Sequence, residues 1–209
     1  MIAIVDYGVG NLFSLRSSFV AIGADAVATS DPDVIRRASG VILPGVGAFR
    51  DAAAKLRETG LWKVVKEEAD AGKPLLGICL GMQMLFEKSY EYGEYEGLGL
   101  ISGSVRPIAD VIPKDYKIPQ IGWNALHLDK PSPILSGIKE GDYVYFVHSY
   151  YAADCDDSVI AVTEYGAPLT AAVQRGNVIG CQFHPEKSGD VGLSILRAFR
   201  DYAEGGAAI

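Results

Sequence analysis

One cysteine stands in a glycine-flanked pattern that could make its thiol a nucleophile. Gly77, Cys79 and Gly81 form the sequence G-x-C-x-G, the thiol counterpart of the G-x-S-x-G turn that places a serine nucleophile between a strand and a helix. Only glycine avoids a Cβ clash at both flanks of so tight a turn. Residues 82–86 favour a helix directly after Cys79. A thiol at a helix N-terminus meets partial positive charge and free N–H groups, which favour the thiolate. Taken alone, the pattern leaves open whether Cys79 is a nucleophile or a buried cysteine that packs as a small hydrophobe.

A histidine and a glutamate near the C-terminus could supply the base that such a nucleophile needs. His184, Pro185 and Glu186 are consecutive, and proline biases the residue before it towards extended geometry. Positions i and i+2 of an extended chain point the same way, so we expect Glu186 beside the His184 imidazole. A carboxylate there would fix the tautomer and stabilise the protonated ring. A His-Pro-Glu turn without function is the alternative, but its occurrence together with Cys79 favours a nucleophile–base–carboxylate triad.

The first half of the chain must place Cys79, and it alternates between strand-like and helix-like segments. Strands are expected at 2–5, 24–29, 40–43 and 74–78, and helices at 12–22, from 32 onward, at 49–58 and at 61–71. This alternation predicts a mostly parallel sheet with helices on both faces. Sites in such sheets lie at the carboxyl ends of the strands. Cys79 and the turn Pro44-Gly45-Val46-Gly47 both follow a strand, so we expect them at the same edge.

The second half must place His184, and its pattern is different. Short strands joined by tight turns are expected at 143–151, 158–163, 169–174 and 178–183. They predict an antiparallel extension of the same sheet. The acidic, tyrosine-rich stretch 87–97 is expected to be a surface loop, and a helix closes the chain near residues 191–199. We expect one domain over residues 1–209.

Composition argues against several classes of function. The net charge of −7 over 209 residues argues against a nucleic-acid partner or an anionic membrane, since both need a basic face. No run of 18 apolar residues predicts a spanning helix, and the N-terminus lacks the basic segment of a signal peptide. Three widely spaced cysteines form neither a disulfide framework nor a C-x-x-C metal site. We therefore expect no metal, no cofactor and a cytoplasmic location.

Together these motifs resemble the class I (triad) glutamine amidotransferases. The wider class shares G-I-C-L-G-M-Q at 77–83 and the H-P-E stretch at 184–186. A narrower resemblance is to the glutaminase subunits of imidazole glycerol phosphate synthases, of histidine biosynthesis. It rests on D-Y-G-V-G-N at 6–11, P-G-V-G at 44–47, G-L-G-L at 97–100, G-W-N at 122–124 and K-S at 187–188. The resemblance covers nearly the whole chain and implies a flavodoxin-like fold. Gln120 departs from the pattern, because the family usually has histidine there.

The resemblance implies that the chain hydrolyses the side-chain amide of L-glutamine to glutamate and ammonia. Cys79 would attack the amide carbon and form a γ-glutamyl thioester. His184, oriented by Glu186, would transfer the protons. The N–H of Leu80 would bind the oxyanion together with the N–H of Val46 or Gly47. By the same resemblance, the substrate would be held by Gly45, Gln83, His148, Ser149 and Tyr150.

The resemblance also implies a partner, because ammonia released into neutral water is mostly protonated and no longer nucleophilic. A family member passes ammonia through a protein channel to a cyclase subunit, a (β/α)8 barrel of about 250 residues. This chain has no room for such a barrel, so we expect a heterodimer. Trp123, Tyr145 and Lys187 are the candidates for the contact, the first two because aromatic residues anchor interfaces. The alternative for Trp123 is an ordinary core tryptophan.

Other functions remain open at this point. The chain could be a class I glutaminase subunit that serves another ammonia-using synthase. It could also be a γ-glutamyl cysteine hydrolase built on the same turn, although Gln83 and the narrower motifs argue against this. A degenerate binding subunit without activity is contradicted by the intact Cys79, His184 and Glu186.

Overall fold

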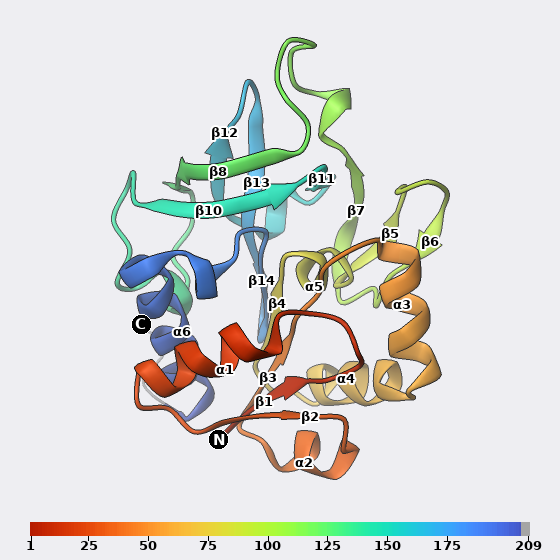
Figure 1. The fold of residues 1–209 in the computed structure, drawn as a ribbon, viewed down its shortest axis with the longest axis vertical. Helices are drawn as coiled ribbons and strands as arrows, with labels where there is room; N and C mark the ends of the chain where they lie inside the picture. Colours follow the sequence, from red (N-terminus) through yellow and green to blue (C-terminus); the bar gives the residue numbers. More distant parts are fainter. Residues whose placement is uncertain (206–209) are drawn as a thin grey trace.

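The computed structural model describes residues 1–205, and an eight-stranded sheet runs through its centre (Figure 1). The strand order is β2-β1-β3-β4-β14-β13-β12-β9. The strands are β1 (Ile2–Val5), β2 (Ala26–Thr29), β3 (Gly40–Leu43), β4 (Leu75–Ile78), β9 (His127–Leu128), β12 (Val159–Glu164), β13 (Pro168–Arg175) and β14 (Val178–Cys181). The five strands from β2 to β14 are parallel, and β13, β12 and β9 continue the sheet antiparallel. The expected mostly parallel sheet with an antiparallel extension is confirmed.

Four of the five parallel strands, β1, β3, β4 and β14, are buried on both faces, which explains their continuous apolar runs. In β1, Ile2 and Ile4 pack into one hydrophobic cluster, whereas Ala3 and Val5 pack into a second cluster on the opposite face. Alternate side chains of a strand point to opposite faces. Both faces of the sheet therefore need a covering layer of helices.

Two groups of helices supply that cover. On one face, α1 (Leu12–Ala21) lies beside α6 (Gly189–Ala203), as Figure 1 shows. The other face is covered by α2 (Pro32–Arg37), α3 (Phe49–Glu58) and α4 (Leu61–Asp70). The expected start of α2 is confirmed, because the Asp31 carboxylate accepts the Asp33 N–H at 2.8 Å and caps the helix.

Two smaller sheets correct the expectation for residues 143–151. In this segment, β10 (Tyr143–His148) pairs antiparallel with β8 (Gln120–Ala125), and β11 (Tyr150–Ala153) belongs to another sheet. That sheet has the order β11-β7-β5-β6, with β5 (Phe86–Ser89), β6 (Tyr95–Glu96) and β7 (Ile101–Pro107). The chain changes sheets at Ser149, so neither β10 nor β11 extends the central sheet. In Figure 1, β8 and β10 cross above the upper end of β14.

Two further expectations need correction. The stretch 87–97 contains β6 and most of β5 rather than only a surface loop. The helix after Cys79 is only the four-residue α5 (Leu80–Gln83). It ends there because the Met84 carbonyl accepts the Leu98 N–H at 2.7 Å and the Leu85 carbonyl accepts the Leu100 N–H at 2.9 Å. These bonds are made with a distant part of the chain, which the local helical pattern does not reveal.

Four short 3-10 turns complete the set of elements. They are η1 (Ile108–Asp110), η2 (Pro133–Leu135), η3 (Asp156–Ser158) and η4 (Pro185–Lys187).

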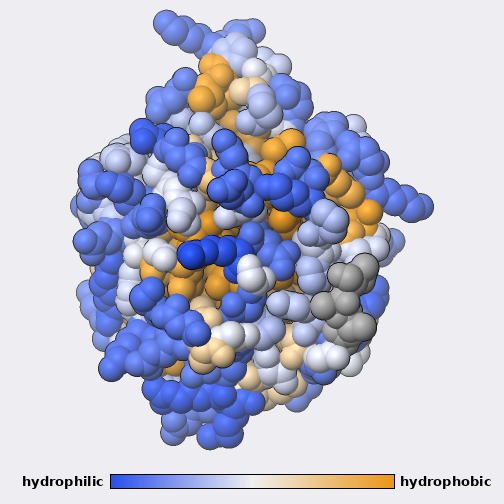
Figure 2. All heavy atoms as spheres, turned by 180° about the vertical axis from the view of Figure 1, so that it is seen from behind, coloured by the Kyte–Doolittle hydropathy of each residue, from blue (hydrophilic) through white to orange (hydrophobic). Residues whose placement is uncertain are grey.

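The surface of the molecule is mainly hydrophilic on the face opposite to that of Figure 1. Figure 2 shows the face behind that of Figure 1, where hydrophilic side chains cover most of the surface and hydrophobic ones are visible in its middle and upper parts. Among the described residues, no helix combines the length and the apolar character that crossing a bilayer requires.

Candidate active site

Cys79 occupies a strained turn at the carboxyl end of β4. Its φ is 55° and its ψ is −111°, immediately before α5 begins. Such a conformation is costly for a residue with a Cβ and is found most often at functional sites. The flanking glycines are required here: a Cβ on Gly81 would lie 1.8 Å from the Leu43 carbonyl oxygen, and one on Gly77 would lie 2.7 Å from the Gly81 carbonyl oxygen. The nucleophile-type turn expected from G-x-C-x-G is therefore present.

His184 follows the neighbouring strand, β14, and lies against Glu186 as expected. Its Nδ1 is 2.8 Å from Glu186 Oε1, and both side chains are almost completely buried. The reason differs from the expected one, because the chain turns into η4 at Pro185 instead of remaining extended. Ser188 secures this turn: its hydroxyl donates to the His184 carbonyl at 2.7 Å and accepts the Tyr145 N–H at 3.0 Å.

The environment of His184 suits a base that works with a thiol. Burial alone would lower the pKa of its imidazole, but hydrogen-bonding contacts with Cys79 and Glu186 outweigh burial and raise the pKa to about 9. Because Glu186 occupies Nδ1, the nitrogen left for Cys79 is Nε2. The ring is thus drawn towards its protonated form beside the sulfur. This is the nucleophile–base–carboxylate order of a triad.

A pocket of about 310 Å³ opens over Cys79 and His184. Seven other residues expected at the site also form its walls: Val46, Gly47, Leu80, Gln83, His148, Ser149 and Tyr150. Gly45 lies behind this wall, where an added Cβ would be 2.8 Å from the Gly81 nitrogen. Glycine at this position therefore allows the 44–47 turn to approach the Cys79 turn closely. The role of Gly45 in binding substrate stays a prediction.

Backbone N–H groups from two turns border the pocket. Leu80 is the first residue of α5, so its N–H has no acceptor within the helix. Val46 and Gly47 line the pocket from the turn after β3, and Gly47 has a φ of 85° that favours glycine. These groups could bind a developing oxyanion. Their assignment to that role stays a prediction.

Amide side chains connect the pocket wall to the sulfur. Gln83 Nε2 donates to the Tyr150 carbonyl at 3.1 Å and to Gln182 Oε1 at 3.0 Å. Gln182 Nε2 in turn donates to Cys79 Sγ at 3.6 Å. Sequence reasoning missed Gln182. The signal was available, because Gln182 precedes His184 by two residues and so shares its face of an extended chain.

His148 is both a packed histidine and part of the pocket wall. Its side chain is buried, and its Nδ1 lies 2.8 Å from the Tyr150 carbonyl. Burial, with a smaller contribution from His184, lowers the pKa of His148 to about 4. His148 therefore stays neutral at neutral pH and leaves His184 as the proton acceptor near Cys79.

Glu91 and Tyr92 also line the pocket and were not expected from the sequence. Glu91 Oε2 accepts the Phe49 N–H at 2.6 Å at the start of α3, and partial burial raises the pKa of Glu91. Glu91 is the acidic side chain among the residues that line the pocket. The acidic, tyrosine-rich composition of 87–97 was the available signal, but the segment was interpreted only as a surface loop.

Three residues expected at a partner interface lie together beside the site. The rings of Trp123 and Tyr145 pack edge to face with centroids 6.0 Å apart, and Lys187 Nζ lies 5.7 Å from the centre of the Tyr145 ring. Trp123 is 52 % exposed, so the alternative of an ordinary core tryptophan is wrong. Their contact with a partner stays a prediction.

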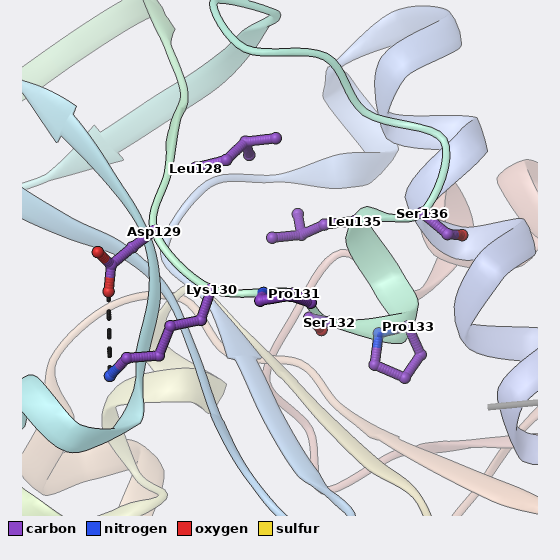
Figure 3. A pocket seen from close by; sticks show the side chains of 8 residues that line it. All are labelled: Leu128, Asp129, Lys130, Pro131, Ser132, Pro133, Leu135 and Ser136. Atoms are coloured by element: carbon purple, nitrogen blue, oxygen red, sulfur yellow. Dashed lines mark ion pairs between the residues drawn. The ribbon is translucent and has the colours of Figure 1, made fainter. Parts of the chain in front are cut away.

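Another hollow, of about 410 Å³, lies away from the triad between the end of β9 and η2 (Figure 3). Its lining is Leu128, Asp129, Lys130, Pro131, Ser132, Pro133, Leu135 and Ser136. The Asp129–Lys130 pair drawn there is 3.9 Å apart, and Lys130 also donates to the Asp156 carbonyl at 2.8 Å. This hollow contains no nucleophile paired with a base, so the chemistry is concentrated around Cys79.

Comparison with known proteins gives consistent matches over almost the whole chain. The family model described as glutamine amidotransferase class-I matches residues 3–200. "Imidazole glycerol phosphate synthase subunit HisH" of Caldanaerobacter subterraneus subsp. tengcongensis is 52 % identical over 200 residues, covering 95 % of this chain and 97 % of the relative. The protein of the same name from Bacillus cereus (strain G9842) is 50 % identical, with 98 % and 96 % covered.

Solved structures agree on the fold. A structure described as "Crystal structure of glutamine amidotransferase" superimposes with a TM-score of 0.76 at 20 % identity, covering 98 % of this chain and all of that chain. "Structure of PurLQS from Thermotoga maritima" gives 0.73 at 21 % identity, with 96 % and 97 % covered. At such identities the likeness supports the architecture alone.

Proposed function

The chain belongs to the class I glutamine amidotransferase family, and on this premise we propose that it is the glutaminase subunit of an imidazole glycerol phosphate synthase. The observation that carries the activity is that Cys79 and His184 line one pocket, with Glu186 bound to Nδ1 of the imidazole. The choice of synthase is supported by relatives of that name that are about half identical over nearly the whole chain. The alternatives of another synthase or a γ-glutamyl hydrolase lack such support.

The reaction follows from the triad geometry. His184 Nε2 takes the thiol proton, and Cys79 Sγ attacks the side-chain amide carbon of glutamine. The tetrahedral oxyanion is bound by the N–H of Leu80 and by that of Val46 or Gly47. The protonated His184 gives its proton to the leaving nitrogen, ammonia departs, and a γ-glutamyl thioester remains. His184 then activates a water molecule that hydrolyses the thioester to glutamate.

The pocket walls match the two ends of glutamine. The side-chain amide must reach Cys79, which places the α-amino and α-carboxylate groups towards the mouth of the pocket. Glu91 offers a carboxylate for the α-ammonium group, and the segment Ser149–Tyr150 and Gln83 offer polar groups on another wall. Gly45 lies behind the Leu80 side of the pocket.

The ammonia has to reach a second active site before it is protonated. We place a (β/α)8-barrel cyclase subunit against the face that carries Trp123, Tyr145 and Lys187, in a cytoplasmic heterodimer. The exposed Trp123, whose ring packs edge to face on the half-buried Tyr145, supports this choice, because aromatic residues anchor interfaces.

The proposal is tested by combining the chain with the cyclase subunit from the same source. We expect cyclase product to form with glutamine as the nitrogen donor, at one glutamate per product. Glutamate release without any gain in product would point to a γ-glutamyl hydrolase or to a different synthase. An assay with γ-glutamyl peptides then separates these two possibilities.

A further inference from the structure

Two buried polar side chains face each other on the inner side of the β8–β10 pair, each with an unmet hydrogen bond. Gln120 and His148 are direct partners in the antiparallel register, so their side chains lie on the same face with Cβ atoms about 5 Å apart. Both are buried. Gln120 Oε1 and His148 Nε2 have no hydrogen-bond partner among residues 1–205. Such atoms are rare in folded proteins and require an explanation.

The His148 ring needs a donor at Nε2. The Tyr150 carbonyl can only accept, so the His148 nitrogen 2.8 Å from it, Nδ1, carries the proton. In a neutral imidazole the other nitrogen, Nε2, is then an acceptor. Burial keeps the ring neutral by lowering its pKa to about 4. Across the strand pair from His148, Gln120 has an amide NH₂ group that can serve as the donor.

The Gln120 amide can reach this arrangement by a half turn about its last bond. In the structure its Nε2 donates to Asn124 Oδ1 at 3.0 Å, which leaves Oε1 without a donor. A half turn exchanges N and O without changing the shape of the side chain. Nε2 is then free to donate to His148, and Oε1 accepts from the Asn124 amide once that group is turned as well. The 3.4 Å hydrogen bond from Asn124 to the Glu164 carbonyl is given up. The Asn124 oxygen then faces that carbonyl and takes its donor from water, which its partly exposed side chain can reach. Satisfying two buried acceptors outweighs one long hydrogen bond.

We propose that Gln120 is a positioning residue for glutamine hydrolysis, whose amide donates to His148 Nε2 and thereby fixes the Tyr150 carbonyl. This inference rests on the proposed function. A histidine at this position could also donate a hydrogen bond, so Gln120→His is the conservative variant.

The effect of Gln120 reaches the sulfur through the amide chain of the pocket wall. The Tyr150 carbonyl that His148 holds is also the acceptor for Gln83 Nε2 at 3.1 Å. Gln83 holds Gln182, which donates to Cys79 Sγ. Because Gln83 and Tyr150 line the pocket, a loosened His148 should disturb substrate binding more than the chemical step.

The test replaces Gln120 in two ways and measures glutamine hydrolysis in the complex with the cyclase subunit. For Gln120→Leu, which removes the donor, we expect KM for glutamine to rise about tenfold, equivalent to about 1.4 kcal/mol, while kcat changes less than threefold. For Gln120→His, both constants should stay within about threefold of the wild type. Thr163→Val is the matched control, since it removes a buried hydrogen bond to the Ala125 carbonyl on the same strand, β8, away from His148. Its KM should not change.

A nitrogen NMR spectrum of the wild-type chain gives an independent measurement. The His148 Nε2 resonance should show an accepted hydrogen bond in the wild type and lose it in Gln120→Leu. An unchanged KM in Gln120→Leu, or the same Nε2 resonance in both proteins, would overturn the inference and assign the donor to water. If the wild type fails to hydrolyse glutamine with its cyclase, the proposed function fails, while the resonance still decides whether Gln120 donates to His148.

Discussion

The Cys79 sulfur and the His184 ring have to be considered as one chemical unit. Each is nearly buried, and the high pKa of His184 depends on its contacts with Cys79 and Glu186. Removing Cys79 or Glu186 therefore changes the protonation of His184. Hydrolysis and the later use of ammonia are nevertheless separate, because only hydrolysis needs the sulfur.

We predict that Cys79→Ser abolishes glutamine-dependent synthesis in the complex, by at least about a thousandfold, and leaves ammonium-dependent synthesis within about twofold. The serine hydroxyl fits the turn but is a far weaker nucleophile than a thiolate at neutral pH. Product formation with each nitrogen donor is the measurement. Parallel loss of both activities would show that the variant had damaged the complex rather than the nucleophile.

Glu91 provides a prediction about substrate binding. Glu91→Gln retains an oxygen that can accept the Phe49 N–H but removes the charge for the α-ammonium group of glutamine. We expect KM for glutamine to rise about tenfold or more, with a smaller change in kcat. Initial rates over a range of glutamine concentrations give both constants. Glu94→Gln, on an exposed residue of the same segment that pairs with Lys88, is the control and should leave KM unchanged.

His148 makes the stability of the fold depend on pH in a defined direction. Its pKa is lowered to about 4, chiefly by burial, whereas in the unfolded chain it is about 6.5. The unfolded chain therefore binds more protons between these values, so stability is complete above about pH 6.5 and falls as the pH drops towards 4. The lost free energy is about 3 kcal/mol at 1.36 kcal/mol per pKa unit.

Urea denaturation at pH 7 and pH 4.5 measures this effect. The non-titrating variant His148→Gln should show a smaller loss of unfolding free energy between the two pH values than the wild type. Equal losses in the two proteins would mean that His148 does not contribute to the acid sensitivity.

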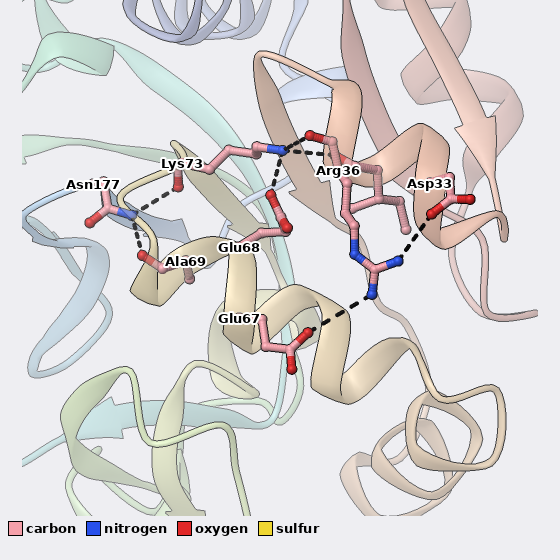
Figure 4. A network of polar contacts seen from close by, with 8 residues as sticks. Asp33, Arg36, Glu67, Glu68, Ala69, Lys73 and Asn177 are labelled. Atoms are coloured by element: carbon pink, nitrogen blue, oxygen red, sulfur yellow. Dashed lines mark hydrogen bonds and ion pairs between the residues drawn. The ribbon is translucent and has the colours of Figure 1, made fainter.

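At the scale of elements, side chains that donate hydrogen bonds to carbonyl groups near helix ends connect the elements of the parallel half. Figure 4 shows Asn177, in the turn between β13 and β14, donating to the Ala69 and Lys73 carbonyls at 2.8 Å each, at the end of α4. Lys73 pairs with Glu68 and also donates to the Ile35 carbonyl at 3.0 Å. The network joins α2, α4 and the β13–β14 turn at the amino-terminal ends of β4 and β14. The pocket lies at the opposite ends of these strands.

We predict that Asn177→Ala lowers the free energy of unfolding by about 1–3 kcal/mol, because two carbonyls at the end of α4 lose a partly buried donor. Glutaminase activity should stay near the wild-type level. Asp33→Asn is the comparison, since it removes an exposed charge that pairs with Arg36 in the first turn of α2 and should change stability by less than about 1 kcal/mol. Denaturant titrations of the two variants test this difference, and equal effects would contradict it.

The parallel half could be predicted from sequence because its inner strands are buried on both faces and therefore consist of uninterrupted apolar runs. The second half could be predicted only in part. The segment 143–151 is strand-like throughout, yet its pairing partners change at Ser149 from β8 to β7. Pairing with distant strands decides such a change. The 87–97 segment was misinterpreted for the same reason, since β5 pairs with β6 and β7.

At the scale of the whole molecule, the site exists because β14 lies next to β4 in the sheet. The Cys79 N–H donates to the Cys181 carbonyl at 2.8 Å, so the nucleophile and the base leave neighbouring strands although about a hundred residues separate them. The sequence could predict that Cys79 and His184 lie close together, because each motif directly follows a strand. Glu91 and Gln182 were missed, because their sequence signals do not say which loop covers the pocket or which amide meets the sulfur. One domain over residues 1–209 stays a prediction.

The face beside the pocket is the proposed binding surface for the cyclase subunit. Trp123 and Ile121 lie on the outer side of β8, and both are exposed. We predict that Trp123→Ala weakens binding to the cyclase subunit at least about tenfold, because an exposed aromatic anchor would be lost. The lone variant should keep the fold, since Trp123 is not part of the core. Tyr116→Ala, at an exposed aromatic residue whose ring packs on Tyr165, is the control and should bind normally. Calorimetric titration of each variant with the cyclase gives the Kd values, and an unchanged Kd for Trp123→Ala would move the interface to another face.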